Sequence, residues 1–204
     1  MKSDDPTVIT LFIGWGQGDG FPDYSELTSR LAERDYEAAY PPITWFGPAP
    51  EWTPTLYQDW LDQVRLLCMR SYHGCRRIYA GFSVGAIIAL AMSAEFSPDE
   101  LWLLSPSAWV PEAMQLDGIA DLSMPSADVL DSLSAVNVRA MAQTIACPVK
   151  VAVGLEERPV MIAWAANVAG LLEATDYFQI CGADHNPLRQ PYLEFIVTEM
   201  ATRQ

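Results

Sequence analysis

The chain has 204 residues, of which 50% are apolar and 19% are charged. This composition predicts a single globular domain spanning 1–204 and excludes a disordered or fibrous protein. The formal net charge of −14 argues against nucleic acid or an anionic membrane surface as a partner. No apolar run reaches the ~20 residues of a membrane span. Residues 1–6 lack the basic and apolar regions of a secretory signal, which favours a cytoplasmic location.

The cysteines and histidines form no pattern that is typical of a metal site. The four cysteines are scattered without a CxxC pair, as expected for free thiols: Cys68, Cys75, Cys147 and Cys181. The two histidines, His73 and His185, have no ligand-spaced neighbours. We therefore expect neither a metal nor another cofactor.

A first strand is predicted at 8–13, a near-continuous apolar run of the kind buried on both faces of a parallel sheet. It is followed by 14–20, where four glycines in seven residues mark a sharp turn or a close backbone approach. The glycine spacing does not match GxGxxG, and no Gly-Lys-Ser/Thr follows, so a phosphate-binding loop is not expected. A loop of this kind could instead supply a backbone N–H to an oxyanion.

A helix, a short strand and a Pro-rich loop are expected next. Asp23 and Glu26 have the spacing of a helix start and predict a helix over 24–34. A short strand is expected at 38–40, and 47–54 reads as a Pro-rich loop.

From Thr55 onward the apolar residues recur every three or four positions, which predicts a helix that ends at Gly74. The residues that form this stripe are Leu56, Trp60, Val64 and Leu67. His73, at the end of that helix, is expected to be a surface or capping residue rather than a catalyst.

The pentapeptide 81–85, Gly-Phe-Ser-Val-Gly, lies between a predicted strand at 77–80 and a predicted buried helix at 86–97. A G-x-S-x-G in this setting is typical of the nucleophile elbow. Its two glycines leave room where a Cβ would collide, and the sharp turn exposes the hydroxyl of Ser83. The start of the helix directs backbone N–H groups at the same point.

The second half of the chain continues the alternation. The predicted elements are a strand at 101–104, a helix at 138–145, a strand at 149–153, a helix at 160–171, a strand at 177–181, and a closing helix with Leu193, Ile196, Val197 and Met200 on one face. The segment 108–136 has weak periodicity and is either a small lid or a long connection. The alternation implies a parallel sheet with helices on both faces, whose functional loops gather at the carboxyl ends of the strands.

A serine nucleophile needs a base, and the base needs an orienting carboxylate. His185 follows the last predicted strand, at the same edge of the sheet as Ser83, and is the expected base. The acid is open between Glu157 and Glu156, which share one turn, and an aspartate after the preceding strand: Asp117, Asp121 or Asp128.

Over nearly its whole length the chain resembles the α/β-hydrolase superfamily. The resemblance rests on 14–16, on 81–85, on the strand-Gly-x-x-acid turn that ends at Glu157, and on 182–185. It implies an α/β fold of about six mostly parallel strands with helices on both faces and a reduced cap. The family places the acid three residues after the glycine of its turn, which selects Glu157 as the partner of Ser83 and His185.

The same resemblance implies an oxyanion hole formed by the backbone N–H groups of Val84 and Trp15. The Gly-Trp-Gly-Gln loop at 14–17 is most similar to pimeloyl-carrier-protein methyl ester esterases and related small carboxylesterases. The chain departs from the family in three ways. Ile13 stands where the family has a histidine before glycine, glutamate replaces the commoner aspartate as acid, and the first strand corresponds to the family's third.

The expected function is a cytoplasmic serine hydrolase that cleaves a small ester or thioester through an acyl-enzyme. The alternative is an inactive protein of the same fold that serves as a binding or scaffold protein, which the missing histidine before Gly14 leaves open. Loop aromatics could line an apolar acyl pocket or pack the core: Trp45, Phe46 and Trp109, with Trp15 and Trp52. A reduced cap favours short to medium acyl chains, and the acidic surface favours a small-molecule ester over one bound to an acidic carrier protein. The oligomeric state stays open.

Overall fold

The computed structural model of the protein describes residues 6–12, 23–40, 43, 56–69, 74–107, 127–133, 135–174 and 176–201. Within these residues, six strands form one sheet in the order β2-β1-β3-β4-β5-β6, and every neighbouring pair is parallel. The strands are β1 (Thr7–Phe12), β2 (Tyr36–Ala39), β3 (Arg76–Phe82), β4 (Glu100–Leu104), β5 (Val149–Gly154) and β6 (Asp176–Ile180). The predicted parallel sheet is confirmed.

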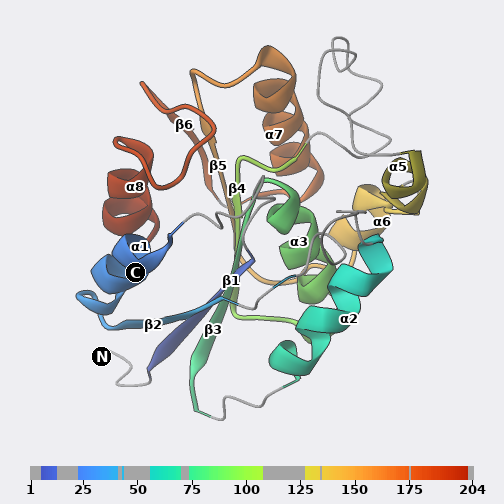
Figure 1. Ribbon diagram of the computed structural model, residues 1–204, viewed down its shortest axis with the longest axis horizontal. Coiled ribbons are helices and arrows are strands. Elements are labelled where there is room, and N and C mark those ends of the chain that lie inside the picture. The colour runs from blue at the N-terminus through green and yellow to red at the C-terminus, as the bar shows by residue number, and fades with distance from the viewer. Residues whose placement is uncertain are drawn as a thin grey trace, which may run out of the picture.

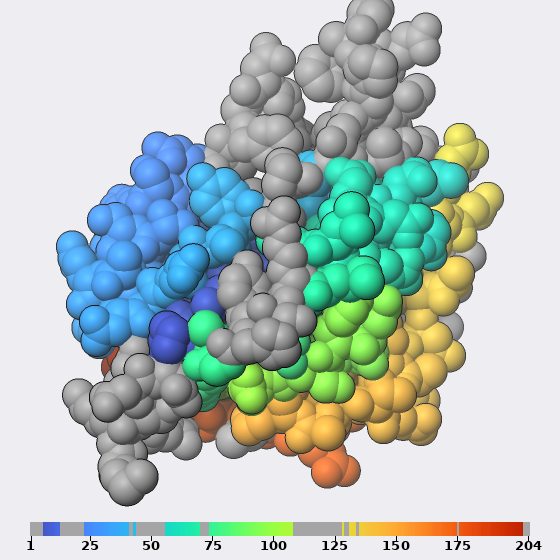
Figure 2. All heavy atoms as spheres, turned by 90° about the horizontal axis from the view of Figure 1, so that it is seen from below, coloured from blue at the N-terminus to red at the C-terminus, as the bar shows by residue number. Residues whose placement is uncertain are grey.

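Helices cover both faces of this sheet (Figure 1). One face packs against α1 (Ser25–Ala32) and against α8 (Tyr192–Phe195), which continues as a π-helical segment at Ile196–Met200. The other face packs against α2 (Tyr57–Cys68), α3 (Val84–Phe96), α6 (Val138–Ala142) and α7 (Pro159–Leu171), and α5 (Ala127–Leu133) contacts α2. Seen from below in Figure 2, the blue segment of α1 and β2 lies on one side of the molecule and the teal α2 on the other. Among the described helices, none has the length and apolar character needed to span a membrane.

Strand β1 illustrates why apolar runs, rather than alternating patterns, mark these strands. Strands β2 and β3 pair with its two edges, and all six of its residues are buried. Ile9 and Leu11 belong to the core on the α1 and α8 face, whereas Phe12 belongs to the core on the α2 and α3 face. A strand in this position needs apolar side chains on both faces.

Helix α2 differs from its prediction in both its end and its buried stripe. It ends at Cys68, and Gly74 lies beyond it with φ +76°. Leu56 caps the helix and is 43% exposed, and Leu67 is half-buried. The buried residues are Tyr57, Trp60, Leu61, Val64 and Cys68. Trp60 and Val64 belong to both the predicted and the observed stripe. The sequence pattern alone therefore did not determine which neighbouring residues complete the buried face of the helix.

Helices α1 and α6 are shorter than predicted. Asp23 accepts a hydrogen bond from the backbone N–H of Ser25 at 2.9 Å, which closes a turn just before α1. The residue at the N-terminal cap of α1 is Tyr24, whose side chain makes no capping hydrogen bond. Helix α6 ends at Ala142, because the amides of Thr144 and Ile145 bond three residues back in the tighter 3₁₀ pattern.

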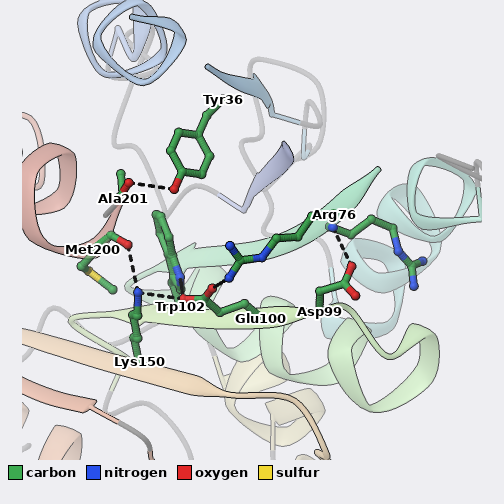
Figure 3. Close-up of polar contacts among 9 residues, drawn as sticks. Tyr36, Arg76, Asp99, Glu100, Trp102, Lys150, Met200 and Ala201 are labelled. Carbon is green, nitrogen blue, oxygen red and sulfur yellow. Dashed lines mark hydrogen bonds and ion pairs between the residues drawn. The ribbon is translucent and has the colours of Figure 1, made fainter. Parts of the chain in front are cut away.

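The C-terminal helix packs as predicted. Its buried residues include Leu193, Ile196, Val197 and Met200. The end of the π-helical segment is fixed by two long side chains from the sheet. Lys150 Nζ donates to the Met200 carbonyl at 3.0 Å, and the Tyr36 hydroxyl donates to the Ala201 carbonyl at 2.7 Å (Figure 3). The structure describes only helix α5 and residues 135–136 of the segment 108–136. The choice between a lid and a long connection therefore lies outside the described residues.

Charged side chains gather at the amino ends of β3, β4 and β5, and two of them, Glu100 and Lys150, are buried (Figure 3). Glu100, which is 3% exposed, accepts from Lys150 Nζ at 2.9 Å and from Trp102 Nε1 at 2.6 Å. Its second oxygen accepts from the Arg76 guanidinium. We call Arg76, Glu100, Trp102 and Lys150 the basal charge cluster. Because every charge in it is paired, the cluster ties three strands and the C-terminal helix together.

Candidate active site

The turn at the end of strand β3 is so sharp that only glycine fits at position 81. A Cβ on Gly81 would lie 2.3 Å from the Gly85 carbonyl oxygen and 2.5 Å from Ala86 Cα. Ser83 follows with φ +55° and ψ −123°, outside the regions that L-residues favour, and α3 starts at the next residue. This is the geometry of a nucleophile elbow, with the serine between a strand and a helix N-terminus.

The backbone of the elbow is held by the end of β4. Ser83 N–H donates to the Leu104 carbonyl at 3.0 Å. The Ser83 carbonyl accepts from the N–H of Ser107 at 3.1 Å and of Ala86 at 3.0 Å. Hydrogen bonds to both the N–H and the carbonyl of Ser83 therefore hold the strained backbone in place.

His185 reaches Ser83 from the loop that follows β6. Its Nε2 lies 3.0 Å from Ser83 Oγ. The His185 side chain is 41% exposed, and its ring lies 4.8 Å from the ring of Phe82, the residue before Ser83. The imidazole is thus partly open to solvent and lies against an aromatic ring.

Glu157 reaches the other nitrogen of the same imidazole. Its Oε2 lies 2.7 Å from His185 Nδ1, while its Oε1 accepts from the Gly154 N–H at 3.0 Å and from the Ser105 hydroxyl. The carboxylate is fully buried. Glu156 is exposed, and it is Glu157, not this neighbour, that contacts the histidine.

The loops after β5 and β6 meet because Gly154 has no side chain. A Cβ at this position would lie 2.2 Å from the Ala183 carbonyl oxygen. The two loops are also joined by backbone hydrogen bonds, from Leu155 N–H to Ile180 O at 3.0 Å and from Glu156 N–H to Ala183 O at 2.9 Å. This close approach carries the acid and the histidine into contact.

The other predicted site residues divide into described and undescribed positions. Val84 is buried and is the first residue of α3, where backbone N–H groups have no partner within the helix. Asp128 is exposed on α5. The remaining positions lie outside the described residues: Trp15, Trp45, Phe46, Trp52, His73, Trp109, Asp117 and Asp121.

Two further residues contact the site, although the sequence did not assign them to it. Ser105 follows the last residue of β4 and donates to the Glu157 carboxylate, and the Tyr192 hydroxyl lies 3.0 Å from Ser105 Oγ. Burial raises the pKa of the Tyr192 phenol, so it stays a neutral hydroxyl. The sequence offers one signal for Ser105, which is its position after a predicted strand. No local sequence pattern distinguishes Tyr192.

The described residues offer no group of three or more His, Cys, Asp or Glu side chains that could hold a metal ion. The arrangement is instead a hydroxyl, an imidazole and a carboxylate in hydrogen-bonded series. Such a series can move a proton from the hydroxyl to the imidazole while the carboxylate balances the positive charge.

Comparison with solved structures shows the α/β-hydrolase fold. The chain is similar to Est1E from Butyrivibrio proteoclasticus, solved with ferulic acid bound (TM-score 0.76, 14% identity, 95% of this chain and 86% of that chain). It is also similar to the esterase domain of a Rhodothermus marinus protein (TM-score 0.70, 16% identity, 98% and 87%). A third similar structure is a monoacylglycerol lipase from Paleococcus ferrophilus (TM-score 0.67, 14% identity, 95% and 92%). No family model matches the chain, and no curated protein matches it.

Proposed function

We propose that this protein is a serine hydrolase that cleaves a small ester or thioester through an acyl-enzyme. The observation that carries the proposal is the continuous series from Ser83 Oγ through His185 to Glu157, with distances of 3.0 and 2.7 Å, on an elbow with a strained serine. The esterases and lipases among proteins of the same fold are consistent with it.

In the proposed reaction, Ser83 Oγ attacks the carbonyl carbon while His185 Nε2 takes its proton. Collapse of the tetrahedral intermediate breaks the bond to the leaving alcohol or thiol, which receives that proton from His185. Water then attacks the carbonyl carbon of the acyl-enzyme while His185 takes a proton from it. Collapse of this second intermediate breaks the bond to Ser83 Oγ, which receives that proton, and releases the acid product. Glu157 holds Nδ1–H, so Nε2 is the nitrogen that accepts the proton.

The backbone N–H of Val84 is the proposed first donor to the oxyanion, because it opens α3 next to Ser83. The backbone N–H of Trp15 is the proposed second donor, on the strength of the sequence resemblance. In comparable sites each such donor contributes about 3–4 kcal/mol to stabilising the transition state.

The proposed substrate is a small-molecule ester with a short to medium acyl chain, bound against Trp45, Phe46 and Trp109. Est1E was solved with ferulic acid bound, so methyl ferulate belongs among the first esters to test beside nitrophenyl acetate, butyrate and octanoate. Rates that increase steadily up to long-chain esters would contradict the proposed preference.

Labelling with a fluorophosphonate separates an enzyme from an inactive protein of the same fold. We expect a single adduct on the peptide that carries Ser83, and none on the Ser83→Ala variant. Wild-type protein that is folded, yet unlabelled and without esterase activity, would favour the binding or scaffold alternative.

A further inference from the structure

We propose that Ser105, supported by Tyr192, is a positioning residue that sets the orientation and charge of Glu157. The inference rests on the proposed hydrolase function of Ser83 and His185. Ser105 does not touch the reacting atoms. It acts through one carboxylate oxygen, Glu157 Oε1, and thereby leaves the other oxygen for the histidine.

The direction of the hydrogen bonds follows from the number of hydrogens. The Ser105 hydroxyl has one hydrogen, and a buried carboxylate only accepts, so Ser105 donates to Glu157 Oε1. Ser105 Oγ is then free to accept from Tyr192. The single hydrogen of the Tyr192 hydroxyl is shared between Ser105 Oγ at 3.0 Å and the Ala152 carbonyl, to which it also donates at 3.2 Å. A donor behind the serine polarises its O–H and strengthens the bond to the carboxylate.

Ser105 is held rigidly for this task. It is 0% exposed and has φ +43°, a backbone region that favours glycine. Its N–H donates to the Ala152 carbonyl at 2.7 Å. Glycine would relieve this strain, but it could not supply the hydroxyl that donates to Glu157.

The same short segment also holds the nucleophile. Leu104 and Ser107, on either side of Ser105, bind the backbone N–H and carbonyl of Ser83. The end of β4 therefore fixes the elbow through its backbone and the acid through the Ser105 side chain. This places both ends of the Ser83–His185–Glu157 series on one rigid support.

The charge of the acid depends on the same hydroxyl. The groups that the described structure places around the pair are the Tyr192 phenol behind Ser105, the Phe82 ring against His185, and the exposed Asp184–Arg189 ion pair on the histidine's own loop. Donors to Glu157 matter most when His185 is neutral, because the carboxylate is then uncompensated. Loss of the Ser105 hydroxyl should therefore make the Glu157–His185 pair hold its proton to higher pH.

The test compares two substitutions that remove the same hydroxyl with opposite effects on the backbone. Ser105→Gly relieves the positive φ, whereas Ser105→Ala retains the strain. We expect both to lower kcat for a nitrophenyl ester by about 10-fold to 100-fold with KM nearly unchanged, although Ser105→Gly is the more stable protein. Tyr192→Phe should lower kcat less, by about 3-fold to 10-fold. Ser97→Gly is the matched control, since Ser97 also has positive φ but lies exposed at the far end of α3.

A second measurement does not depend on turnover. The chain has two histidines, so NMR resolves the titration of His185, with His73→Ala to assign the signals. We expect the midpoint of the His185 titration to move to higher pH in Ser105→Gly and to stay in place in Ser97→Gly.

The outcomes separate the two proposals. A wild-type kcat and an unmoved His185 titration in Ser105→Gly would overturn the positioning role while the hydrolase function stands. A wild-type protein without labelling or turnover would overturn the hydrolase function, and the titration alone would then decide whether Ser105 acts on the Glu157–His185 pair.

Discussion

At the scale of single residues, the carboxylate of Glu157 is the most constrained group of the site. It is fully buried, and a buried charge is costly unless donors surround it. Its donors come from three different parts of the sheet: the Gly154 N–H at the end of β5, the Ser105 hydroxyl just after β4 and the His185 imidazole after β6. The exposed Glu156 has none of these partners in the described structure, which makes the two neighbours a matched pair for a test.

Replacing Glu157 with glutamine should lower kcat by about 10⁴-fold. The amide NH₂ can donate to His185 Nδ1, which favours the tautomer with the hydrogen on Nε2, and this tautomer cannot accept the Ser83 proton. Glu156→Gln should retain wild-type activity. Steady-state kinetics on a nitrophenyl ester, with circular dichroism to check folding, measures both. Near-wild-type turnover of Glu157→Gln would show that the acid lies elsewhere.

Phe82→Leu tests the aromatic support of His185. The Phe82 ring lies 4.8 Å from the imidazole, and the face of an aromatic ring attracts a cation. Because His185 becomes an imidazolium in the proposed reaction, loss of the ring should lower kcat by about 2-fold to 5-fold, which corresponds to about 0.5–1 kcal/mol. Single-turnover acylation rates measure the step in which the charge forms. An unchanged acylation rate would mean that Phe82 only packs.

At the scale of elements, the site depends on how closely neighbouring loops approach. The glycine at position 154 lets the turn after β5 touch the turn after β6, and Gly81 lets β3 touch its own helix. Both contacts bring backbone against backbone, so neither can be relieved by rotating a side chain. The distances between Ser83, His185 and Glu157 are therefore properties of packed turns.

Gly154→Ala should reduce activity by several orders of magnitude and also destabilise the protein. The new Cβ would lie 2.2 Å from the Ala183 carbonyl oxygen, so the histidine loop must shift away from Glu157. Gly170→Ala is the control, because nothing lies within 4 Å of its added Cβ and alanine favours a helix by about 0.5–1 kcal/mol. Urea unfolding and fluorophosphonate labelling rates on both variants give the comparison. Equal labelling rates for Gly154→Ala and Gly170→Ala would show that the close approach at Gly154 does not position His185.

The elements differ in how well the sequence predicts them, and the reason is distance along the chain. The elbow was predictable because the chemistry and the sterics lie within residues 81–85, and the buried strands because their apolar runs are continuous. Ser105 and Tyr192 were missed because they are 52 residues from Glu157 and 87 residues from Ser105, respectively. The phase of α2 was missed because Trp60 and Val64 fit two stripes equally well.

At the scale of the whole molecule, the carboxyl ends and the amino ends of the strands have different roles. The carboxyl ends of β3, β4, β5 and β6 lead into the residues of the candidate site. The amino ends of β3, β4 and β5 carry the basal charge cluster, which joins the sheet to the C-terminal helix. Since the helix that begins with Tyr192 also supports Ser105, the cluster and the site share one element at opposite ends.

Lys150→Met tests whether the basal charge cluster holds this helix in place. The substitution keeps a long apolar stem but removes the cation from Glu100 and the donor from the Met200 carbonyl. Breaking a buried pair on one side should lower the free energy of unfolding by about 3–5 kcal/mol. Glu95→Gln, which breaks the partly exposed pair with Arg65, should cost less than about 1 kcal/mol. Urea titrations measure both values.

The folded Lys150→Met protein should keep its kcat well below the unfolding transition, because the substitution is at the opposite edge from Ser83. Adding Glu100→Gln to it should cost less than the sum of the single losses, since the carboxylate left unpaired by the first change is then neutral. A urea midpoint for Lys150→Met equal to that of the wild type would mean that apolar packing of Leu193, Ile196 and Met200 holds the C-terminal helix without the cluster.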